Sequence, residues 1–347
     1  MQMENNVNTQ IFRALLNSQN KDETSTVHPH ALSFFSEISQ HVSASSTIED
    51  DYKIRVQQRI AALSSESLNI LMVGAADVGK TSTLAALFGE HSWSESAETP
   101  QLIARHELEH LTLWESRLPS ESADPKRMTA ELGSLLSEND EQGRPLIDLV
   151  LVVLDATSNN LEDCYRDISD TLVPMLGRQT ENRLMVLMNK ADKVARNVRG
   201  TSSSQLMPLD AEIWLDCTAA TIRYRLIHNT GVQTRPIAYS ALAGESPSHR
   251  PYNLMKVIAR MMVTLPEEKR LLLLNQPFTR GDDYWRDHDD RLLYLQSVEN
   301  LCFDNLHLGA RDGDRFGGQL GAFLGRNGRA LGEIVCDALR RQFGISI

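Results

Sequence analysis

Cysteine is scarce in this chain of 347 residues, and long apolar runs are absent. No two of the four cysteines form a CxxC pair, so neither a zinc site nor a disulfide framework is expected from Cys164, Cys217, Cys302 and Cys336. The longest apolar runs, RLLLLNQ and IDLVLVVLDA, fall well short of the roughly 20 residues that cross a bilayer. The first residues carry no basic region followed by an apolar stretch, so no secretory signal is expected. These absences predict a soluble, cytoplasmic protein with reduced thiols.

Glycine, proline and positive charge are not in excess either. The 19 glycines and 12 prolines are close to average usage, which excludes a collagen-like or low-complexity chain. Lys and Arg number 35 against 46 Asp and Glu, and the net charge of −11 argues against general nucleic-acid binding. Apolar residues make up 41% of the chain, which is enough for a sizeable core, and the length suggests about two domains.

The hydrophobic pattern divides the chain into three parts. Residues 1–65 are polar with patches of helical spacing, and we expect a helical N-terminal extension. Residues 66–266 alternate short apolar runs with amphipathic segments. Residues 267–347 have a helical pattern again and include a glycine-rich segment, in which every fourth residue is glycine at Gly317, Gly321 and Gly325. On a helix, glycines at this spacing would form a flat stripe against which another helix can pack closely. We expect a tight contact within the chain or in a dimer rather than insertion into a membrane.

The middle part has the pattern of an α/β domain. Strands are expected at 69–73, 111–114, 147–154, 184–188 and 236–239. Helices are expected between them, at 81–87, 125–138, 160–176, 208–228 and 252–264. The runs rich in Val, Ile and Leu fit strands that are buried on both faces. The predicted fold class is therefore α/β, with a mostly parallel sheet covered by helices on both faces and helical extensions at both ends.

A phosphate-binding loop follows the first of these strands. Residues 74–81 read GAADVGKT and fit GxxxxGK[ST] in full, between a strand and a helical segment. In such a loop, backbone N–H groups and the helix N-terminus bind the β-phosphate of a nucleotide. Lys80 would neutralise the β and γ charges, and the Thr81 hydroxyl would bind Mg²⁺. The expected nucleotide contacts are Gly74, Ala75, Ala76, Asp77, Val78, Gly79, Lys80, Thr81 and Ser82.

A base-reading motif, NKAD, follows a later strand at residues 189–192. Asp192 can accept hydrogen bonds from the N1–H and the exocyclic amine of guanine, a pair of donors that adenine does not supply. Asn189 would bridge the base and the phosphate loop, and the aliphatic stem of Lys190 would lie against the purine ring. After a further strand, backbone N–H groups would meet a guanine carbonyl from the segment Ser240, Ala241 and Leu242.

With these elements in this order, the chain resembles the P-loop GTPases, and more closely the Era-like and dynamin-related branch of bacterial GTPases. The resemblance covers roughly residues 66–266 and rests on GxxDVGKT, LTLW, IDLVLVVLDAT, NKAD and SAL. It implies a G domain that binds GTP or GDP with Mg²⁺ and hydrolyses GTP as a molecular switch. Ribosome, membrane and protein partners all fit this branch, so the resemblance leaves the partner open.

The chain departs from that family after the LTLW strand. The family has DxxG there, whereas this chain has Glu115-Ser116-Arg117-Leu118. Glu115 is longer than Asp by one methylene, and Leu118 in place of glycine is expected to hinder approach of the backbone to the γ-phosphate. The expected catalytic residues are Lys80, Thr99 and Glu115, and the expected Mg²⁺ ligands are Thr81, Thr99 and Glu115. No glutamine offers itself to position water, so hydrolysis is expected to be slow or to depend on a partner.

Three other functions stay open. Asp155 ends an apolar strand, which would suit the Walker B position of an ATPase. The altered switch would suit a pseudo-GTPase with a structural nucleotide, whose helical flanks bind a protein partner or form a homodimer. The flanks and the glycine stripe would also suit a dynamin-like protein at a membrane surface, although nothing specific indicates a membrane. No specific nucleic-acid partner is indicated.

Overall fold

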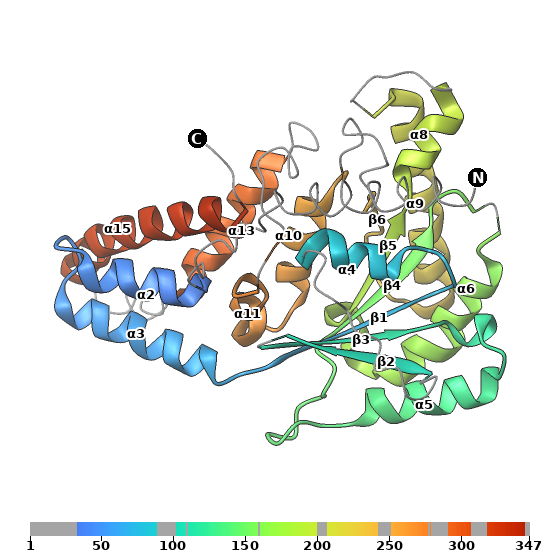
Figure 1. Ribbon diagram of the computed structural model, residues 1–347, viewed down its shortest axis with the longest axis horizontal. Helices are drawn as coiled ribbons and strands as arrows, with labels where there is room; N and C mark the ends of the chain where they lie inside the picture. Colours follow the sequence, from blue (N-terminus) through green and yellow to red (C-terminus); the bar gives the residue numbers. More distant parts are fainter. Residues whose placement is uncertain are drawn as a thin grey trace, which may run out of the picture. The chain divides into compact units, whose positions relative to one another are not determined.

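The computed structural model describes residues 33–88, 102–108, 110–158, 160–199, 207–241, 251–276, 278, 291–306 and 318–343. Within these residues, six strands form one sheet in the order β2-β3-β1-β4-β5-β6 (Figure 1). The strands are β1 (Leu68–Gly74), β2 (Ile103–Glu107), β3 (Leu111–Ser116), β4 (Leu149–Asp155), β5 (Leu184–Asn189) and β6 (Ile237–Ala238). β2 runs antiparallel to β3, and the other neighbouring strands are parallel.

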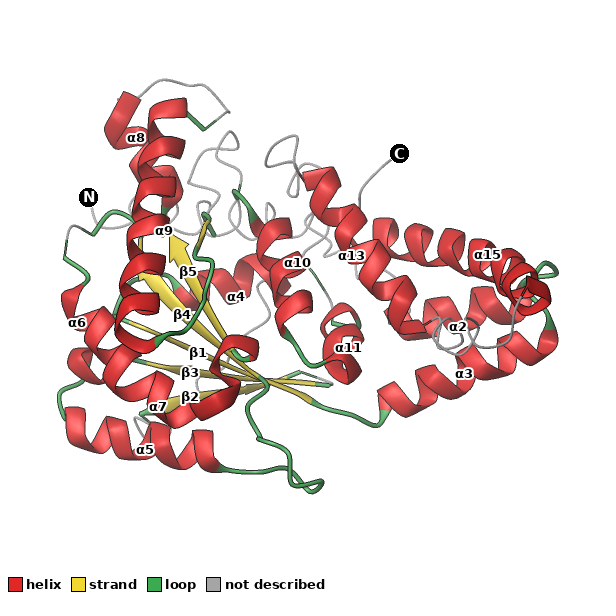
Figure 2. Cartoon of the chain, turned by 180° about the vertical axis from the view of Figure 1, so that it is seen from behind, coloured by secondary structure: helices red, strands yellow, loops and turns green. Residues whose placement is uncertain are grey.

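The central strands are buried on both faces because their side chains alternate between two apolar cores. In β1, Ile70 and Met72 belong to one core, and Leu71 and Val73 belong to the other. The first core is closed by α4 (Lys80–Phe88), α10 (Leu254–Thr264) and α11 (Arg270–Leu274). The second is closed by α5 (Pro125–Ser137), α6 (Glu162–Arg166), the π-helix η2 (Asp167–Leu172), α7 (Val173–Leu176), α8 (Ala191–Arg199) and α9 (Leu209–Thr230) (Figure 2).

The predicted fold class is confirmed, because the sheet is mostly parallel and has helices on both faces. Each predicted strand corresponds to an observed one, and each predicted helix of the middle part lies within a few residues of its expected position. The sequence does not predict β2 or α8. β2 is an edge strand with mostly exposed or half-buried residues, so it has no apolar run to reveal it. α8 is largely polar and begins inside the NKAD motif.

Helices from the two ends of the chain pack together beside the first core. α2 (Phe34–Ala44) packs against α3 (Asp50–Ser64) and α15 (Gly318–Phe343), and α13 (Arg291–Leu306) packs against α10 and α15 (Figure 1). Their buried side chains are continuous with the core over the sheet. The residues from Ser33 onward form one compact unit. The division at residues 65 and 266 into an N-terminal extension, a nucleotide-binding domain and a C-terminal region stays a prediction.

Two polar contacts, one buried and one partly buried, connect the flanks to each other and to the rest of the molecule. The backbone N–H of Phe35 in α2 donates to the Asn275 side chain at 3.0 Å, just after α11. The backbone N–H of Glu49, before α3, donates to Asn327 of α15 at 2.9 Å. Because the donors and acceptors are far apart in the sequence, these bonds fix how the end segments meet.

The glycine-rich segment lies on α15, although Gly317 and the side-chain surroundings of Gly321 fall outside the described residues. A methyl group added at Gly325 would meet nothing within 4 Å, so the expected tight contact within the chain is absent at this position, and a contact in a dimer stays a prediction. Gly328, one turn further, is buried. None of the helices in the described part of the chain combines the length and the apolar character of a membrane-spanning segment.

Candidate nucleotide-binding site

The loop between β1 and α4 has the backbone of a phosphate cradle. Gly79 has φ 91°, a left-handed conformation that favours glycine, and Asp77 has φ 56°. A Cβ at Gly79 would lie 2.3 Å from Nδ2 of Asn189, and a Cβ at Gly74 would lie 2.5 Å from the carbonyl oxygen of Val153. Both glycines are therefore required by close approach of the loop to β4 and β5.

Lys80 begins α4 and turns its ammonium back into the loop. Its side chain is only 7% exposed, and Nζ donates to the carbonyl oxygens of Gly74 at 3.2 Å and Ala75 at 2.9 Å. Burial lowers the pKa of Lys80, and the nearby Glu115 carboxylate partly offsets that effect. The loop thus holds a positive charge at the N-terminus of a helix, where an anion binds favourably.

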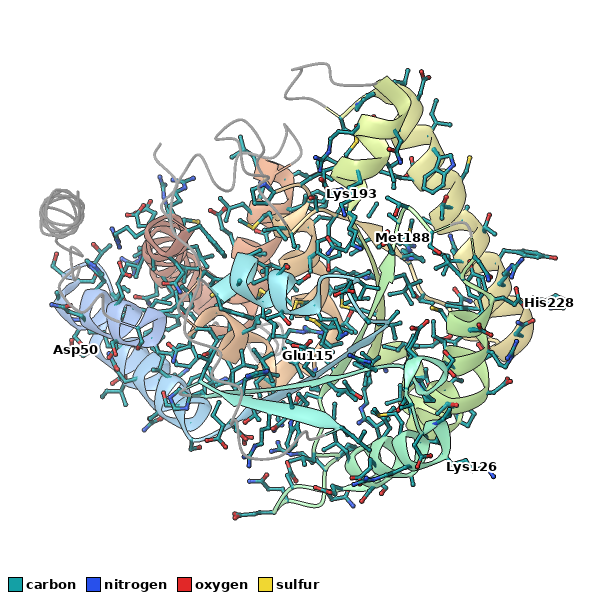
Figure 3. All side chains as sticks on the ribbon, turned by 45° about the vertical axis from the view of Figure 1, so that its right-hand side comes forward. Asp50, Glu115, Lys126, Met188, Lys193 and His228 are labelled. Carbon is teal, nitrogen blue, oxygen red and sulfur yellow. The ribbon has the colours of Figure 1, made fainter. Side chains whose placement is uncertain are left out.

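Thr81 and Glu115 form a pair of oxygen ligands next to Lys80. The Thr81 hydroxyl lies 3.2 and 3.1 Å from the two carboxylate oxygens of Glu115. Glu115 reaches it because β3 pairs with β1, which places Glu115 opposite Met72 near the carboxyl end of the sheet (Figure 3). A hydroxyl and a carboxylate suit Mg²⁺, which binds one or two protein oxygens and takes its other ligands from phosphate and water. Consistent with that partial set, the described residues contain no group of three His, Cys, Asp or Glu side chains that could hold a metal alone.

Asn189 joins the phosphate loop to the segment after β6. Its Nδ2 donates to the carbonyl oxygen of Val78 at 2.8 Å, and its Oδ1 accepts the backbone N–H of Ala241 at 3.1 Å. The side chain is buried, so both bonds are shielded from water. Asn189 therefore connects the phosphate loop to the segment after β6, and its expected contact with the base stays a prediction.

Asp192 lies at the beginning of α8, beside that bridge. Its Oδ1 accepts the Ser240 hydroxyl at 2.8 Å, and its Oδ2 pairs with Arg196 one helical turn further. Two of the three expected N–H donors already have protein acceptors, since Ser240 N–H donates to the Tyr252 carbonyl oxygen at 3.0 Å and Ala241 N–H donates to Asn189 at 3.1 Å. If a guanine carbonyl used the Ala241 N–H, it would share that group with Asn189.

Lys190 and Asp155 form an ion pair of 2.6 Å between the ends of β5 and β4. Burial raises the pKa of Asp155, but hydrogen bonds from Lys190 and from Thr157 outweigh it, so the pKa lies below its ordinary value. The carboxylate accepts both the backbone N–H and the hydroxyl of Thr157. Asp155 thus has a full set of structural partners, which argues against a Walker B role.

The remaining expected site residues fall into two groups. Thr99 and Leu242 lie outside the described residues, so their roles stay predictions. Leu118 has an ordinary φ of −67°, and its side chain is fully buried in the core beneath α5. The Leu118 side chain therefore points into the core, and its expected hindrance of the backbone at the γ-phosphate stays a prediction.

Sequence reasoning did not identify two partners of the site. Arg196 pairs with Asp192, and the spacing of four residues on a helix directly after NKAD was the available signal. The Tyr239 hydroxyl lies 2.7 Å from the Thr83 hydroxyl and connects the end of β6 to α4. Burial raises the pKa of Tyr239, so this hydroxyl stays protonated and available for hydrogen bonding.

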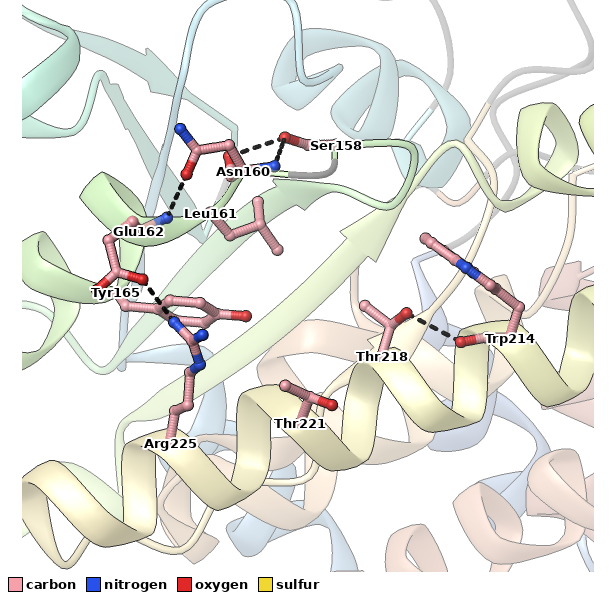
Figure 4. Close-up of a pocket in the computed structure, with 9 residues that line it drawn as sticks. All are labelled: Ser158, Asn160, Leu161, Glu162, Tyr165, Trp214, Thr218, Thr221 and Arg225. Atoms are coloured by element: carbon pink, nitrogen blue, oxygen red, sulfur yellow. Dashed lines mark hydrogen bonds and ion pairs between the residues drawn. The ribbon is translucent and has the colours of Figure 1, made fainter.

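A cavity of about 270 Å³ lies apart from the phosphate loop, between α9 and the segment that begins α6 (Figure 4). Tyr165 and Arg225 stack at 4.7 Å along its wall, and Arg225 also pairs with Glu162 at 2.6 Å. The cation is therefore already neutralised. The other lining residues are Ser158, Asn160, Leu161, Trp214, Thr218 and Thr221.

No protein-family model matches the chain, and no curated protein matches it in sequence. Solved structures with a likeness include Toc33 from Arabidopsis thaliana in complex with Mg²⁺ and GMPPNP, at 12% identity over 68% of this chain and 93% of that one, with a TM-score of 0.39. The FeoB G-domain from Methanococcus jannaschii is 22% identical over 56% of this chain and 98% of its own, with a TM-score of 0.30. LeoA, a bacterial dynamin GTPase from ETEC, is 14% identical over 90% of this chain and 45% of its own, with a TM-score of 0.36.

These likenesses are low, and the class of protein is defined by the chain's own features. The strand order, the antiparallel β2, and the glycine loop between β1 and α4 together form a P-loop G-domain fold, extended by helices at both ends.

Proposed function

We propose that this protein binds guanine nucleotide and is a slow, Mg²⁺-dependent GTPase of the Era-like and dynamin-related kind that acts as a molecular switch. The observation that carries the proposal is the Asn189 bridge. It joins the loop that holds Lys80 to the segment that carries Ser240 and Ala241, with Asp192 beside it. The residues that we propose for phosphate binding and for base reading are thus joined by direct contacts, which supports a single site.

Each part of the site has a distinct task in this proposal. Lys80 and the N–H groups at the start of α4 bind the phosphates, and Asp192 accepts hydrogen bonds from guanine. Thr81 and Glu115 would hold Mg²⁺, which supplies charge neutralisation at the β- and γ-phosphates when bound. Hydrolysis is expected to be slow, because none of the residues assigned to the site is a glutamine that could position water.

A titration of purified protein with GTP, GDP and ATP, with and without Mg²⁺, tests the proposal. We expect GTP and GDP to bind more tightly than ATP, and Mg²⁺ to strengthen GTP binding. Phosphate release measured on the same sample then separates a slow GTPase from a protein that only binds. Equal affinity for ATP and GTP would contradict guanine recognition, and no binding of either would contradict the nucleotide site.

Asp192→Asn should lower affinity for GDP by at least about a hundredfold, because two hydrogen bonds to a carboxylate are lost. Xanthosine diphosphate carries a carbonyl where guanine carries the amine, and its affinity should rise because an amide can donate to it. Competition binding with both nucleotides measures the change. Arg196→Gln is the matched control, since it removes the ion pair but keeps the carboxylate. If both variants lost affinity for GDP to the same extent, loss of the ion pair with Arg196 would explain the effect, and loss of contacts to the base would not.

Glu115→Gln should reduce the rate of GTP hydrolysis by roughly tenfold or more and raise the Mg²⁺ concentration needed for half-maximal activity. The amide keeps the length and one acceptor oxygen but removes the charge that holds the cation. Phosphate release as a function of Mg²⁺ measures both effects. Glu138→Gln, at the exposed C-terminal end of α5, is the control and should leave both values unchanged. An unchanged Mg²⁺ requirement in Glu115→Gln would contradict the assignment of Glu115 as a ligand of Mg²⁺.

The alternative of a pseudo-GTPase keeps its support from Glu115 in place of aspartate. In that case the nucleotide stabilises the fold, and the helices α2, α3, α13 and α15 bind a protein partner. Tight GDP binding without any multiple-turnover phosphate release would favour it. A dynamin-like role at a membrane surface rests on the helical flanks and the glycine stripe, and liposome sedimentation in each nucleotide state tests it.

A further inference from the structure

α9 is apolar on two opposite faces. Its inner face packs Ala211, Leu215, Ile222 and Leu226 into the second core. Its outer face exposes large apolar side chains, namely Leu209 at 66%, Ile213 at 52%, Trp214 at 37%, Tyr224 at 68% and Ile227 at 36%. Of the nine large apolar side chains exposed in the described part of the chain, five are on this one helix. A helix that is apolar on opposite faces is expected to be covered on both.

The outer residues have the spacing of a helix-pairing seam. Ile213, Cys217, Ala220, Tyr224 and Ile227 follow one another at intervals of four, three, four and three residues. That alternation places all five on one line of the helix, as in the a and d positions of a coiled coil. Cys217 is exposed, and it and Ala220 are small, so a second helix could approach closely at the centre of the seam.

The charges beside the seam would pair with the opposite charges of a second α9 that runs in the antiparallel direction. Asp216 and Arg223 are both exposed, lie on the same edge of the seam, and stand at almost equal distances before and after Ala220. Among the described residues neither one forms an ion pair. In an antiparallel pair centred on Ala220, Asp216 of each helix would lie beside Arg223 of the other, and Ile213 opposite Ile227. A parallel pair would not bring these opposite charges together.

We propose that the outer face of α9 is a docking surface for a second copy of this chain, which pairs through its own α9 in the antiparallel direction. The seam points away from the sheet, and Figure 3 shows His228 of the same helix at the outer edge of the molecule. The cavity in Figure 4 flanks the seam on the side of Trp214, and the pairing does not require it. The proposal does not depend on nucleotide binding.

Charge exchange tests the pairing in the full-length protein. Asp216→Arg or Arg223→Asp alone would place like charges together twice across the two-fold axis, and each should weaken the dimer by roughly tenfold or more. The double variant D216R/R223D restores opposite charges and should recover the wild-type association. Analytical ultracentrifugation over a range of protein concentrations measures all four proteins. Circular dichroism checks that each one is folded, which is expected because both positions are exposed.

A cysteine at the axis gives an independent readout. In a Cys217→Ser background, Ala220→Cys should form a disulfide-linked dimer under mild oxidation, because the two Ala220 positions face each other. Asn229→Cys in the same background is the control, since Asn229 is exposed on another side of α9 and should cross-link poorly. A wild-type protein that stays monomeric at every concentration would overturn the proposal. So would a dimer that Ile213→Glu leaves intact, or one in which the double charge exchange does not rescue the single changes.

Discussion

Lys80→Ala should weaken binding of GTP by about two to four orders of magnitude. The ammonium is the one cation that the phosphate loop itself provides, and charge-assisted hydrogen bonds to phosphate are worth about 1.5–3 kcal/mol each. Loss of two of them amounts to about 3–6 kcal/mol, which corresponds to roughly a hundredfold to ten-thousandfold in affinity. The measurement is a titration with a fluorescent GTP analogue. GDP should lose less, since it lacks the γ-phosphate charge.

The fold should tolerate this change. Lys80 is buried, and burial lowers its pKa, so removal of the ammonium relieves a desolvation cost while it breaks two bonds to loop carbonyls. Lys193→Ala, at an exposed position of α8, is the control and should bind GTP as the wild type does. Wild-type affinity in Lys80→Ala would contradict the assignment of the loop as the phosphate site.

The lowered pKa of Lys80 also predicts a dependence on pH. The free protein loses the Lys80 proton at a lower pH than an ordinary lysine does. GTP affinity should therefore decrease as the pH rises toward the alkaline range, and Lys80→Ala should make that slope shallower, since only the loss of the guanine N1 proton then remains. The same titration repeated at several pH values measures the effect.

Lys269→Met should destabilise the protein by about 3–5 kcal/mol, because it leaves a buried carboxylate without its cation. Lys269 Nζ lies 2.7 Å from Asp148 Oδ1, and the two side chains are 3% and 5% exposed. The second oxygen of Asp148 accepts the backbone N–H of Asn69 at 2.8 Å. The pair thus connects the turn before α11 to the start of β4 and to β1. Urea unfolding measures the loss in the free energy of unfolding.

A double variant separates the ion pair from simple loss of packing. Burial raises the pKa of Asp148 even with the Lys269 charge beside it, so the carboxylate alone is costly to keep charged. Asp148→Asn with Lys269→Met removes both charges, keeps an acceptor for Asn69, and should be more stable than Lys269→Met alone. Lys53→Met breaks a surface pair with Asp50 and should cost less than about 1 kcal/mol. If Lys269→Met lowered the free energy of unfolding no more than Lys53→Met does, the buried pair would not be important for stability.

Glu115 is one methylene longer than the aspartate expected at this position from the resemblance to P-loop GTPases. Its longer side chain lets both carboxylate oxygens reach the Thr81 hydroxyl directly. In the proposed GTPase, Mg²⁺ therefore has to enter between two groups that already bind each other. That competition offers a physical reason for a slow or strongly Mg²⁺-dependent enzyme, and the Glu115→Gln variant measures it.

The local features of this protein were determined by its sequence. The loop at residues 74–81 forms because two glycines permit a tight backbone beside β1, and α4 begins at Lys80 as the motif predicts. Unbroken runs of Val, Ile and Leu predict the buried strands, and amphipathic segments predict the helices of the middle part. These features depend on residues that are close in the chain, so the sequence alone was sufficient.

Tertiary structure decided the features that depend on distant segments. β2 is held by its pairing with β3, the Leu118 side chain is directed into a core that α5 closes, and Lys269 meets Asp148 across more than a hundred residues of chain. The outer seam of α9 is the clearest case, because sequence periodicity shows that both faces are apolar but not which one the sheet covers. Tertiary packing alone determines which face is buried. The hydrophobic effect stabilises burial of either apolar face, because it is non-directional and does not specify what covers that face.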